Sequence, residues 1–232
     1  MSKKLISASQ IKNVSGCARK WYFEYIDRIK QPKTDALQDG IDFHDVIDHI
    51  YKEKEFSRNY PEKIIEMVTE AWETGLFDLD TDNYESEVKI QFDVDENHYL
   101  RGYVDLVDYE NHVIVDHKTV KEFKWGLSED DLKVDVQMMV YSYWYLSKFP
   151  EVEEIGLRHN QVLKKNPKKS RPVETTVTRE HVMRFWEEKI LRASKALHLV
   201  RQRETADDVP CNTKNCYQYG ECHLLSRGKC NQ

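Results

Sequence analysis

Apolar residues recur every three or four positions through the first third of the chain, with polar residues between them. This spacing predicts a helix that starts after Ser7, an aromatic helical segment over 17–26, and further helices over 35–54 and 61–77. Ser7 is a candidate N-cap, because a serine hydroxyl can accept a hydrogen bond from a free amide of the first helical turn.

Further along the chain, apolar residues recur at every second position, which is typical of strands with one buried face. Short gaps between the first three strands indicate antiparallel hairpins. Helical spacing returns twice later in the chain, so the pattern predicts an α/β (α+β) fold. The strands are expected over 85–94, 99–107, 113–118, 154–163 and 173–177, and the later helices over 128–149 and 179–203.

Charged residues interrupt two of these strands. Asp105 lies within the first, and Asp116 and Lys118 lie near the end of the next. Residues two apart on a strand share a face, and pairing about the turn at 110–112 would bring Asp105 close to them. Two carboxylates and a lysine that converge in this way suggest a metal site with a cationic helper. The alternative is a partly exposed cross-strand ion pair, which contributes little to stability.

The net charge of the chain argues against a protein whose whole surface attracts polyanions such as nucleic acids. The 232 residues carry a formal net charge of -6, so any nucleic-acid contact must come from a local basic patch. The most basic segment is either such a contact or a solvated hairpin tip; its cations are Lys164, Lys165, Lys168, Lys169 and Arg171. No apolar run approaches the roughly 20 residues that span a bilayer. The N-terminus also lacks the apolar core of a signal peptide, so we expect a cytoplasmic protein (host cytoplasm for a phage-encoded chain) without a membrane partner.

Cysteines crowd the polar C-terminal tail, which has no helical or strand period. Cys17 stands alone near the N-terminus, and four others follow after position 205: Cys211, Cys216, Cys222 and Cys230. An odd number of cysteines in a cytoplasmic chain makes a disulfide framework improbable and favours metal binding. A tail that cannot bury a core of its own also needs a crosslink.

Four short motifs stand in a fixed order on the expected helix, strands and following helix. They are Gly40-x-x-x-His44, Gly102-x-x-Asp105, Asp116-His117-Lys118-Thr119 and Gln137-x-x-x-Tyr141. In this order the chain resembles the PD-(D/E)XK nuclease superfamily. Within it, the chain is similar to the RecB-like branch that includes CRISPR-adaptation nucleases and phage exonucleases. The resemblance covers nearly the whole chain and implies a central mixed sheet flanked by helices.

The resemblance also implies a catalytic centre. His44, Asp105, Asp116 and the carbonyl of His117 would hold Mg²⁺ or Mn²⁺, which lowers the pKa of a bound water. Lys118 would orient or deprotonate that water, and Gln137 and Tyr141 would position the water or the DNA strand. Glu85 or Glu87 would add a further carboxylate, and the sequence does not choose between them. We also expect Gly40 to allow a close approach of its helix to the sheet.

An iron–sulfur branch of the family places one cysteine near the N-terminus and three near the C-terminus. The resemblance implies a 4Fe-4S cluster on Cys17, Cys216, Cys222 and Cys230, with Cys211 as the spare. Cys211, Cys216 and Cys222 form an alternative C-terminal trio. The family often has Cys-Pro where this chain has Cys17-Ala18, and thiolates alone suit zinc as well as iron–sulfur.

The expected organisation is a single nuclease domain over 1–232. Its parts are a helical region (about 1–78), a catalytic sheet and helix (79–178), a long helix (179–204) and a cluster tail (205–232). The expected activity is exonucleolytic hydrolysis of single-stranded DNA or DNA ends in recombination, repair, phage replication or CRISPR-type adaptation. A helicase, recombinase or integrase-type partner and a homo-oligomer fit this interpretation. The alternatives are a silent nucleic-acid-binding module and a zinc or iron–sulfur regulatory protein. Cleavage polarity and strand preference stay open.

Overall fold

A computed structural model describes residues 2–29, 31–32, 34–55, 59–77, 84–217 and 221–230. The chain forms two compact units, each built from separate stretches of sequence. Unit 1 comprises Met1–Pro32, Gln91–Arg101 and Phe185–Gln232, and unit 2 comprises Lys33–Ile90 and Gly102–Arg184. The expected single nuclease domain with four consecutive parts stays a prediction.

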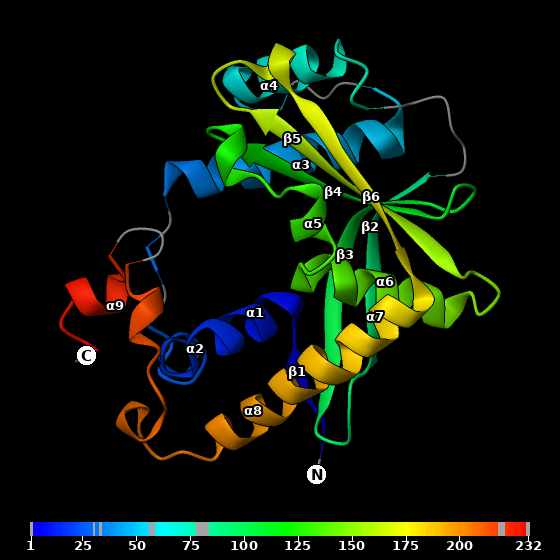
Figure 1. The fold of residues 1–232 in the computed structure, drawn as a ribbon. Helices are drawn as coiled ribbons and strands as arrows, with labels where there is room; N and C mark the ends of the chain where they lie inside the picture. The colour runs from blue at the N-terminus through cyan, green and yellow to red at the C-terminus, as the bar shows by residue number, and fades with distance from the viewer. Residues whose placement is uncertain are drawn as a thin grey trace. The chain divides into compact units, whose positions relative to one another are not determined.

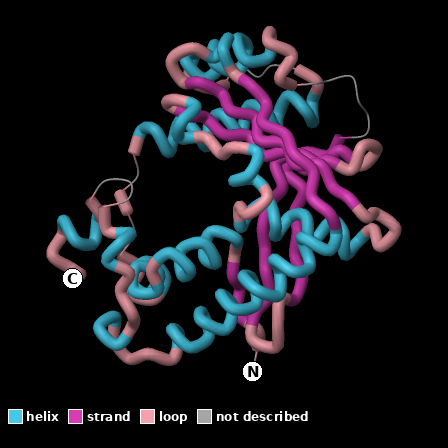
Figure 2. Tube along the Cα trace, viewed as in Figure 1, coloured by secondary structure: helices cyan, strands magenta, loops and turns pink. Residues whose placement is uncertain are grey.

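A mixed sheet forms the centre of unit 2 (Figures 1 and 2), as predicted. Strand β4 pairs antiparallel with β3 and parallel with β5, and β5 pairs antiparallel with β6. The parallel β4–β5 pair requires a crossover connection, which the helical segment between these strands supplies. Strand β2 pairs with β3 on its other side. The bounds are β2 Tyr84–Asp93, β3 His98–Asp108, β4 Val113–Val120, β5 Glu154–Leu163 and β6 Arg171–Thr178.

The helices α3 (Asp35–Glu53) and α4 (Glu62–Trp72) bury their apolar stripes against this sheet. Burial of these side chains supplies most of the favourable free energy of folding in this unit. The shared core contains Phe43, Val46, Ile47, Ile50, Ile64, Met67, Val68, Leu106, Val115 and Val162.

The helix predicted over 128–149 is divided into α5 (Glu129–Leu132) and α6 (Val136–Lys148). The apolar spacing continues across the division, which is why the sequence pattern did not show it. Asp135 has extended backbone and accepts hydrogen bonds from the amides of Gln137 and Met138, so it caps the start of α6. This new start matters because Gln137 lies in the first turn of α6.

The long helix predicted over 179–203 is present as three consecutive segments. They are α7 (Arg179–Phe185), a π-helical segment (Trp186–Ile190) and α8 (Leu191–Arg201). The Thr178 hydroxyl accepts a hydrogen bond from the amide of His181 at 3.2 Å and so caps the start of α7.

Unit 1 holds the N-terminal helices and the cysteine tail. The short strand β1 (Lys4–Ile6), which the sequence did not predict, pairs parallel with residues 98–100 of β3. Extended backbone at Cys17 separates α1 (Ala8–Gly16) from α2 (Ala18–Tyr25). Three residues are too few to show a strand period, and β1 exists because β3 offers it an edge.

Side-chain hydrogen bonds attach the tail to α2. The Arg19 side chain donates to the carbonyl of Val209 at 2.8 Å, and the Tyr22 hydroxyl donates to that of Glu204 at 2.9 Å. Val209 and Leu224 are buried. In the part of the tail that the structure describes, the regular segments are short: 3₁₀ turns η4 (Ala206–Asp208) and η5 (Thr213–Asn215) and helix α9 (His223–Ser226).

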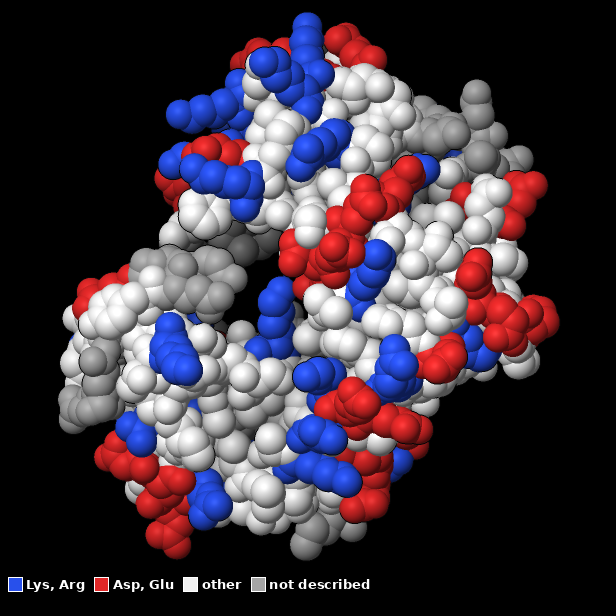
Figure 3. Space-filling view, in the orientation of Figure 1, with Lys and Arg blue, Asp and Glu red and all other residues white. Residues whose placement is uncertain are grey.

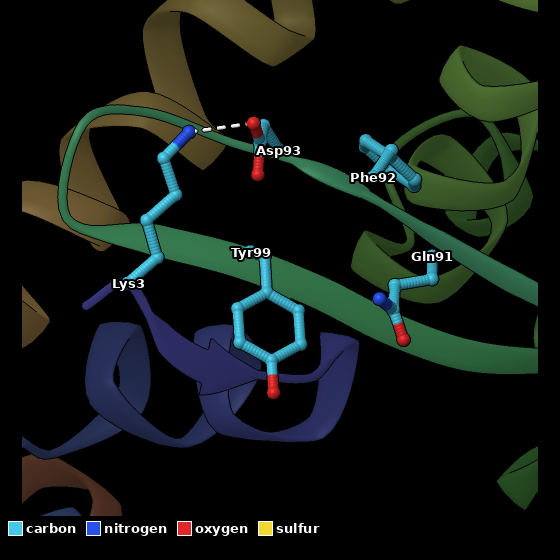
Figure 4. Close-up of a pocket in the computed structure, with 5 residues that line it drawn as sticks. All are labelled: Lys3, Gln91, Phe92, Asp93 and Tyr99. Atoms are coloured by element: carbon cyan, nitrogen blue, oxygen red, sulfur yellow. Dashed lines mark ion pairs between the residues drawn. The ribbon is translucent and has the colours of Figure 1, made fainter.

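A hollow of about 500 Å³ lies in unit 1 (Figure 4). Lys3 and Asp93 face each other across it and form an ion pair at 2.6 Å, so their charges neutralise one another. Its other lining residues are Gln91, Phe92 and Tyr99. None of the residues expected to be catalytic lines it. No helix in the described ranges is long and apolar enough to cross a membrane.

Candidate metal centre

Asp105 and Asp116 occupy facing positions on the antiparallel strands β3 and β4 of unit 2. Leu106 pairs with Val115 in the register, so continuing it by one residue brings the two aspartates together. The backbone N–H of His117 donates to Asp105 Oδ2 at 2.7 Å rather than to a carbonyl of the partner strand. The carboxylate therefore takes a place in the hydrogen-bond ladder, which fixes its position.

The two buried carboxyl groups have opposite pKa shifts. Burial, reinforced by the nearby charge of Asp116, raises the pKa of Asp105 to about 7. Burial also opposes ionisation of Asp116, but Lys118 and His159 outweigh it and hold the pKa of Asp116 below its usual value. Two adjacent carboxylates in a buried site repel each other, and a cation between them would relieve that repulsion.

Lys118 lies directly beside Asp116. Its Nζ atom donates to Asp116 Oδ1 at 3.0 Å, and the side chain is 42% exposed. Burial lowers the pKa of Lys118, but Asp116 and Asp105 together raise it above the usual lysine value. The ammonium group thus combines a fixed place beside the carboxylates with access from solvent.

His44 reaches the carboxylates from α3. Its Nδ1 lies 3.3 Å from Asp105 Oδ2, and burial, reinforced by Lys118, lowers its pKa. A neutral imidazole is the form that binds metals. Gly40 does not have the expected role: a side-chain carbon there would lie 3.9 Å from Thr119 Oγ1, an ordinary contact, so alanine would fit.

The structure distinguishes the two glutamates that the sequence left open. Glu85 accepts a hydrogen bond from the hydroxyl of Tyr109 at 2.8 Å. Glu87 instead lies with His44 and Asp105, and one ligand atom of each falls within 4.8 Å of the others. Glu87 has a positive φ of 48° within strand β2, an uncommon backbone conformation for glutamate that often marks a functional site.

This donor set fits a hard divalent cation. An octahedral Mg²⁺ or Mn²⁺ ion with ligand bonds of about 2.1 Å places its ligand atoms roughly 3 to 4 Å apart. One ligand atom from each of His44, Glu87 and Asp105 lies within 4.8 Å of the others. Asp116 borders this group through the shared pairing with Asp105. Carboxylates with one imidazole suit Mg²⁺ and Mn²⁺.

The side chain of His117 points away from the carboxylates into the α3–α4 core. It packs edge-on to Phe77, with ring centroids 5.3 Å apart, and its Nδ1 lies 3.2 Å from the side-chain nitrogen of Asn160. Burial lowers its pKa to about 3, so the ring is neutral. The backbone N–H of His117 contacts the centre through its hydrogen bond to Asp105, and the role implied for the His117 carbonyl stays a prediction.

Gln137 and Tyr141 project from one face of α6, as their spacing predicted. Gln137 Nε2 donates to Asp116 Oδ1 at 2.9 Å and to the Tyr141 hydroxyl at 3.2 Å. The Tyr141 hydroxyl donates to the carbonyl of Tyr103 at 2.6 Å. The Tyr141 ring also explains Gly102, because a side-chain carbon at Gly102 would lie 3.3 Å from it.

Strand β5 supplies two polar residues that the sequence did not single out. His159 and Gln161 are buried opposite Asp116 and Lys118 in the parallel ladder. His159 Nε2 lies 3.4 Å from Asp116 Oδ2, and His159 Nδ1 lies 3.2 Å from Gln161 Nε2. The run His159-Asn160-Gln161 was the available signal, because three polar residues interrupt an otherwise apolar strand.

The basic segment lies in the connection between β5 and β6, around the 3₁₀ turn η2 (Pro167–Lys169). Lys165, Lys168, Lys169 and Arg171 are exposed, whereas Lys164 is half-buried and donates to the carbonyl of Ala36. Lys168 lies 3.9 Å from Glu73. A role of these cations in nucleic-acid binding stays a prediction.

All five cysteines lie in unit 1, and the structure forms no disulfide between them. The Sγ atoms of Cys211 and Cys230 are 3.9 Å apart, and the Cys17 sulfur accepts a hydrogen bond from the amide of Asn212. Burial, with Cys17 and Cys230 nearby, raises the pKa of Cys211 to about 12. Cys216 has Cys222, Cys17 and Cys230 as neighbours. The structure brings the thiols together but does not set Cys211 apart as the spare.

Two solved structures that align with this chain carry exonuclease names. A crystal structure of an exonuclease candidate from Eubacterium rectale aligns with 98% of this chain and 89% of its own, at 14% identity and a TM-score of 0.62. A phage-related exonuclease from Haemophilus somnus 129PT aligns with 87% of this chain and 97% of its own, at 10% identity and a TM-score of 0.40. At these identities the first likeness shows a shared fold.

No curated protein matches the sequence. The sequence pattern of one family does, over residues 5–81 and 76–223. These stretches include the candidate metal centre in unit 2 and most of the cysteine tail in unit 1. The chain therefore belongs to the PD-(D/E)XK nuclease superfamily.

Proposed function

We propose that this protein is a Mg²⁺- or Mn²⁺-dependent deoxyribonuclease that acts as an exonuclease on single-stranded DNA or DNA ends. The observation that carries the proposal is the convergence of Asp105, Asp116 and Lys118 from two strands. Gln137 holds Asp116 from α6, and His44 and Glu87 complete a donor set for a divalent ion.

The metal would be held by His44, Glu87, Asp105 and Asp116, with the His117 carbonyl as a further ligand by family resemblance. It would supply a water of lowered pKa and positive charge beside the scissile phosphate. In hydrolysis the water oxygen bonds to phosphorus, the ester P–O bond breaks and the leaving oxygen takes up a proton. Lys118 would orient the water and stabilise the negative charge that develops on the phosphate oxygens.

The other residues position these groups. Gln137 and His159 hold the two oxygens of Asp116, so the carboxylate keeps one orientation. Tyr141 links Gln137 to the backbone of Tyr103. Lys164, Lys165, Lys168, Lys169 and Arg171 would contact the DNA backbone, whose phosphates attract local cations even on a chain of net negative charge.

We further propose that thiols of unit 1 hold a second cofactor. Cys17, Cys216, Cys222 and Cys230 would hold a 4Fe-4S cluster, with Cys211 as the alternative to Cys230. Its role would be to clasp α1 and α2 to the tail. A helicase, recombinase or integrase-type partner and self-association belong to the same proposal, because the nuclease would need DNA ends presented to it.

A time course on DNA labelled at either the 5′ or the 3′ end tests the activity and its polarity. Single- and double-stranded substrates are incubated with Mn²⁺, with Mg²⁺ or with EDTA. We expect metal-dependent release of short labelled products from one end. The Asp130→Asn variant is a matched control, since its carboxylate is 93% exposed and pairs only locally with Lys133. Absence of cleavage with both metals and all substrates would refute the proposal.

A further inference from the structure

An exposed aromatic ring stands directly after the catalytic strand. The 3₁₀ turn η1 (Phe123–Trp125) follows β4 closely, so Trp125 lies only a few residues beyond Lys118. Trp125 is 61% exposed, the highest value among the large apolar side chains that the structure describes. A tryptophan left open to water beside a functional strand points to an interaction site.

The turn is fixed to the row of site residues on β5. Gly126 touches the Gln161 side chain so closely that a side-chain carbon at Gly126 would overlap it. Gln161 Nε2 donates to the carbonyl of Leu127 at 2.6 Å, and Gln161 pairs with Lys118 in the β4–β5 ladder. The position of Trp125 is therefore set by the same strands that set the metal centre.

Cations from two segments surround the aromatic rings. The Arg171 guanidinium lies 4.2 Å from the centroid of the Phe123 ring, and Lys124 Nζ lies 5.4 Å from that of Trp125. A hydrogen bond from Lys124, together with the charges of Lys121 and Lys165, lowers the pKa of Glu122, so Lys165 of the basic segment lies near this turn. We call Phe123, Trp125, Lys121, Lys165 and Arg171 the aromatic–cationic patch.

The patch remains positive although Glu122 is beside it. Glu122 pairs with Lys124 at 2.9 Å, which leaves the charges of Lys121, Lys165 and Arg171. Figure 3 shows Lys and Arg side chains gathered over the β5–β6 connection of unit 2 near α4. A flat ring among cations combines the two features that single-stranded nucleic acid recognises, a stacking surface for a base and positive charge for phosphates.

We propose that Trp125 stacks on a base of single-stranded DNA while the cations of the aromatic–cationic patch hold the flanking phosphates. This rests on the proposed nuclease function and specifies its substrate. Bases inside a duplex are covered on both faces by their neighbours, whereas an unpaired base offers a free face to Trp125. The patch would therefore select single strands and lead them to Asp116 and Lys118.

If a base stacks on the Trp125 ring, removing the base and removing the ring should weaken DNA binding by the same factor. Fluorescence anisotropy in EDTA would measure the Kd of a labelled oligothymidylate and of an oligomer of equal length with abasic sites. Stacking on an aromatic side chain changes affinity by roughly fivefold to a hundredfold per base. We expect the wild type to bind the abasic oligomer at least about fivefold more weakly, and Trp125→Ala to bind both oligomers equally.

Two further variants keep the test decisive. Trp125→Phe retains a ring and should restore part of the difference, and Leu199→Ala, which removes a 55% exposed apolar side chain in unit 1, should leave it unchanged. A Trp125→Ala protein that still distinguishes the two oligomers as the wild type does would overturn the inference. So would a wild type that cleaves DNA with Mn²⁺ but binds both oligomers equally. A wild type that neither binds nor cleaves DNA would overturn the proposed function as well.

Discussion

The two clusters of chemically active side chains in this protein differ in what holds them in place. In unit 2, Asp116 accepts hydrogen bonds from Lys118 and Gln137, and Asp105 accepts one from a backbone amide. In unit 1, three of the cysteines (Cys17, Cys216 and Cys222) lie at the ends of short helices and turns. Burial raises the pKa of the Cys211 and Cys216 thiols. The carboxylate centre is organised by the fold itself, whereas the thiols would become a set of ligands only with a metal that stabilises their ionised form.

The largest expected effect comes from Asp116→Asn. The amide keeps the shape of the side chain but loses the charge and an acceptor for Lys118 or Gln137. Metal-dependent cleavage should fall by at least about a hundredfold, because charge stabilisation at the reacting phosphate is lost. Gel assays of labelled DNA measure the rate, and circular dichroism checks the fold. Cleavage within twofold of wild type would show that the carboxylate centre is not the active one.

Cys216→Ser should affect unit 1 and leave the carboxylate centre intact. If the thiols hold a structural metal site, this variant should lose bound iron or zinc, and its Tm should fall by about 10 °C. Visible absorbance and metal analysis distinguish iron–sulfur from zinc. Cys211→Ser and Cys230→Ser measured side by side show which thiol is the spare. Unchanged metal content in all three variants would contradict a thiolate site.

The two glutamates of β2 provide a matched pair. Glu87→Gln should weaken Mn²⁺ binding by roughly tenfold, since Glu87 lies with His44 and Asp105. Glu85→Gln should leave it unchanged, because Glu85 binds the Tyr109 hydroxyl instead. Calorimetric titration with Mn²⁺ measures both. Equal Mn²⁺ affinities in the two variants would show that Glu87 is not a metal ligand.

The smallest expected effect is a gain in stability. Gly40→Ala replaces a glycine within α3 at a position where a side-chain carbon meets only Thr119 Oγ1 at 3.9 Å. Alanine favours helix over glycine, so the free energy of unfolding should rise by about 0.5–1 kcal/mol. Urea denaturation measures the change. A loss of stability would show that α3 packs more closely on the sheet than the structure has it.

The sequence alone predicted the helices and strands whose apolar residues recur at a regular spacing, and it predicted the residues of the four ordered motifs. Asp105, Asp116 and Lys118 stood out because charge interrupted apolar strands, and His44, Gln137 and Tyr141 followed from the family order. The choice of Glu87 over Glu85 depended on which of the two lies beside His44 and Asp105, and the spacing of residues along β2 does not encode this.

The contributions of His159 and Gln161 required knowledge of which strands are neighbours. The parallel pairing of β4 with β5 joins residues about forty positions apart, and local spacing does not reveal it. The exposed turn at Trp125 was missed for a related reason. Its meaning comes from Gln161 and Arg171, which approach it from β5 and β6.

The most direct test of the central claim is the rate of Mn²⁺-dependent cleavage of end-labelled single-stranded DNA by wild type and Lys118→Ala. Lys118 is not among the proposed metal ligands, so this variant separates the chemistry from metal binding. We predict that wild type releases labelled products with Mn²⁺ and none with EDTA. Lys118→Ala should bind DNA and Mn²⁺ but cleave at least about a hundredfold more slowly. Equal rates for the two proteins would contradict the assignment of this site as a nuclease centre.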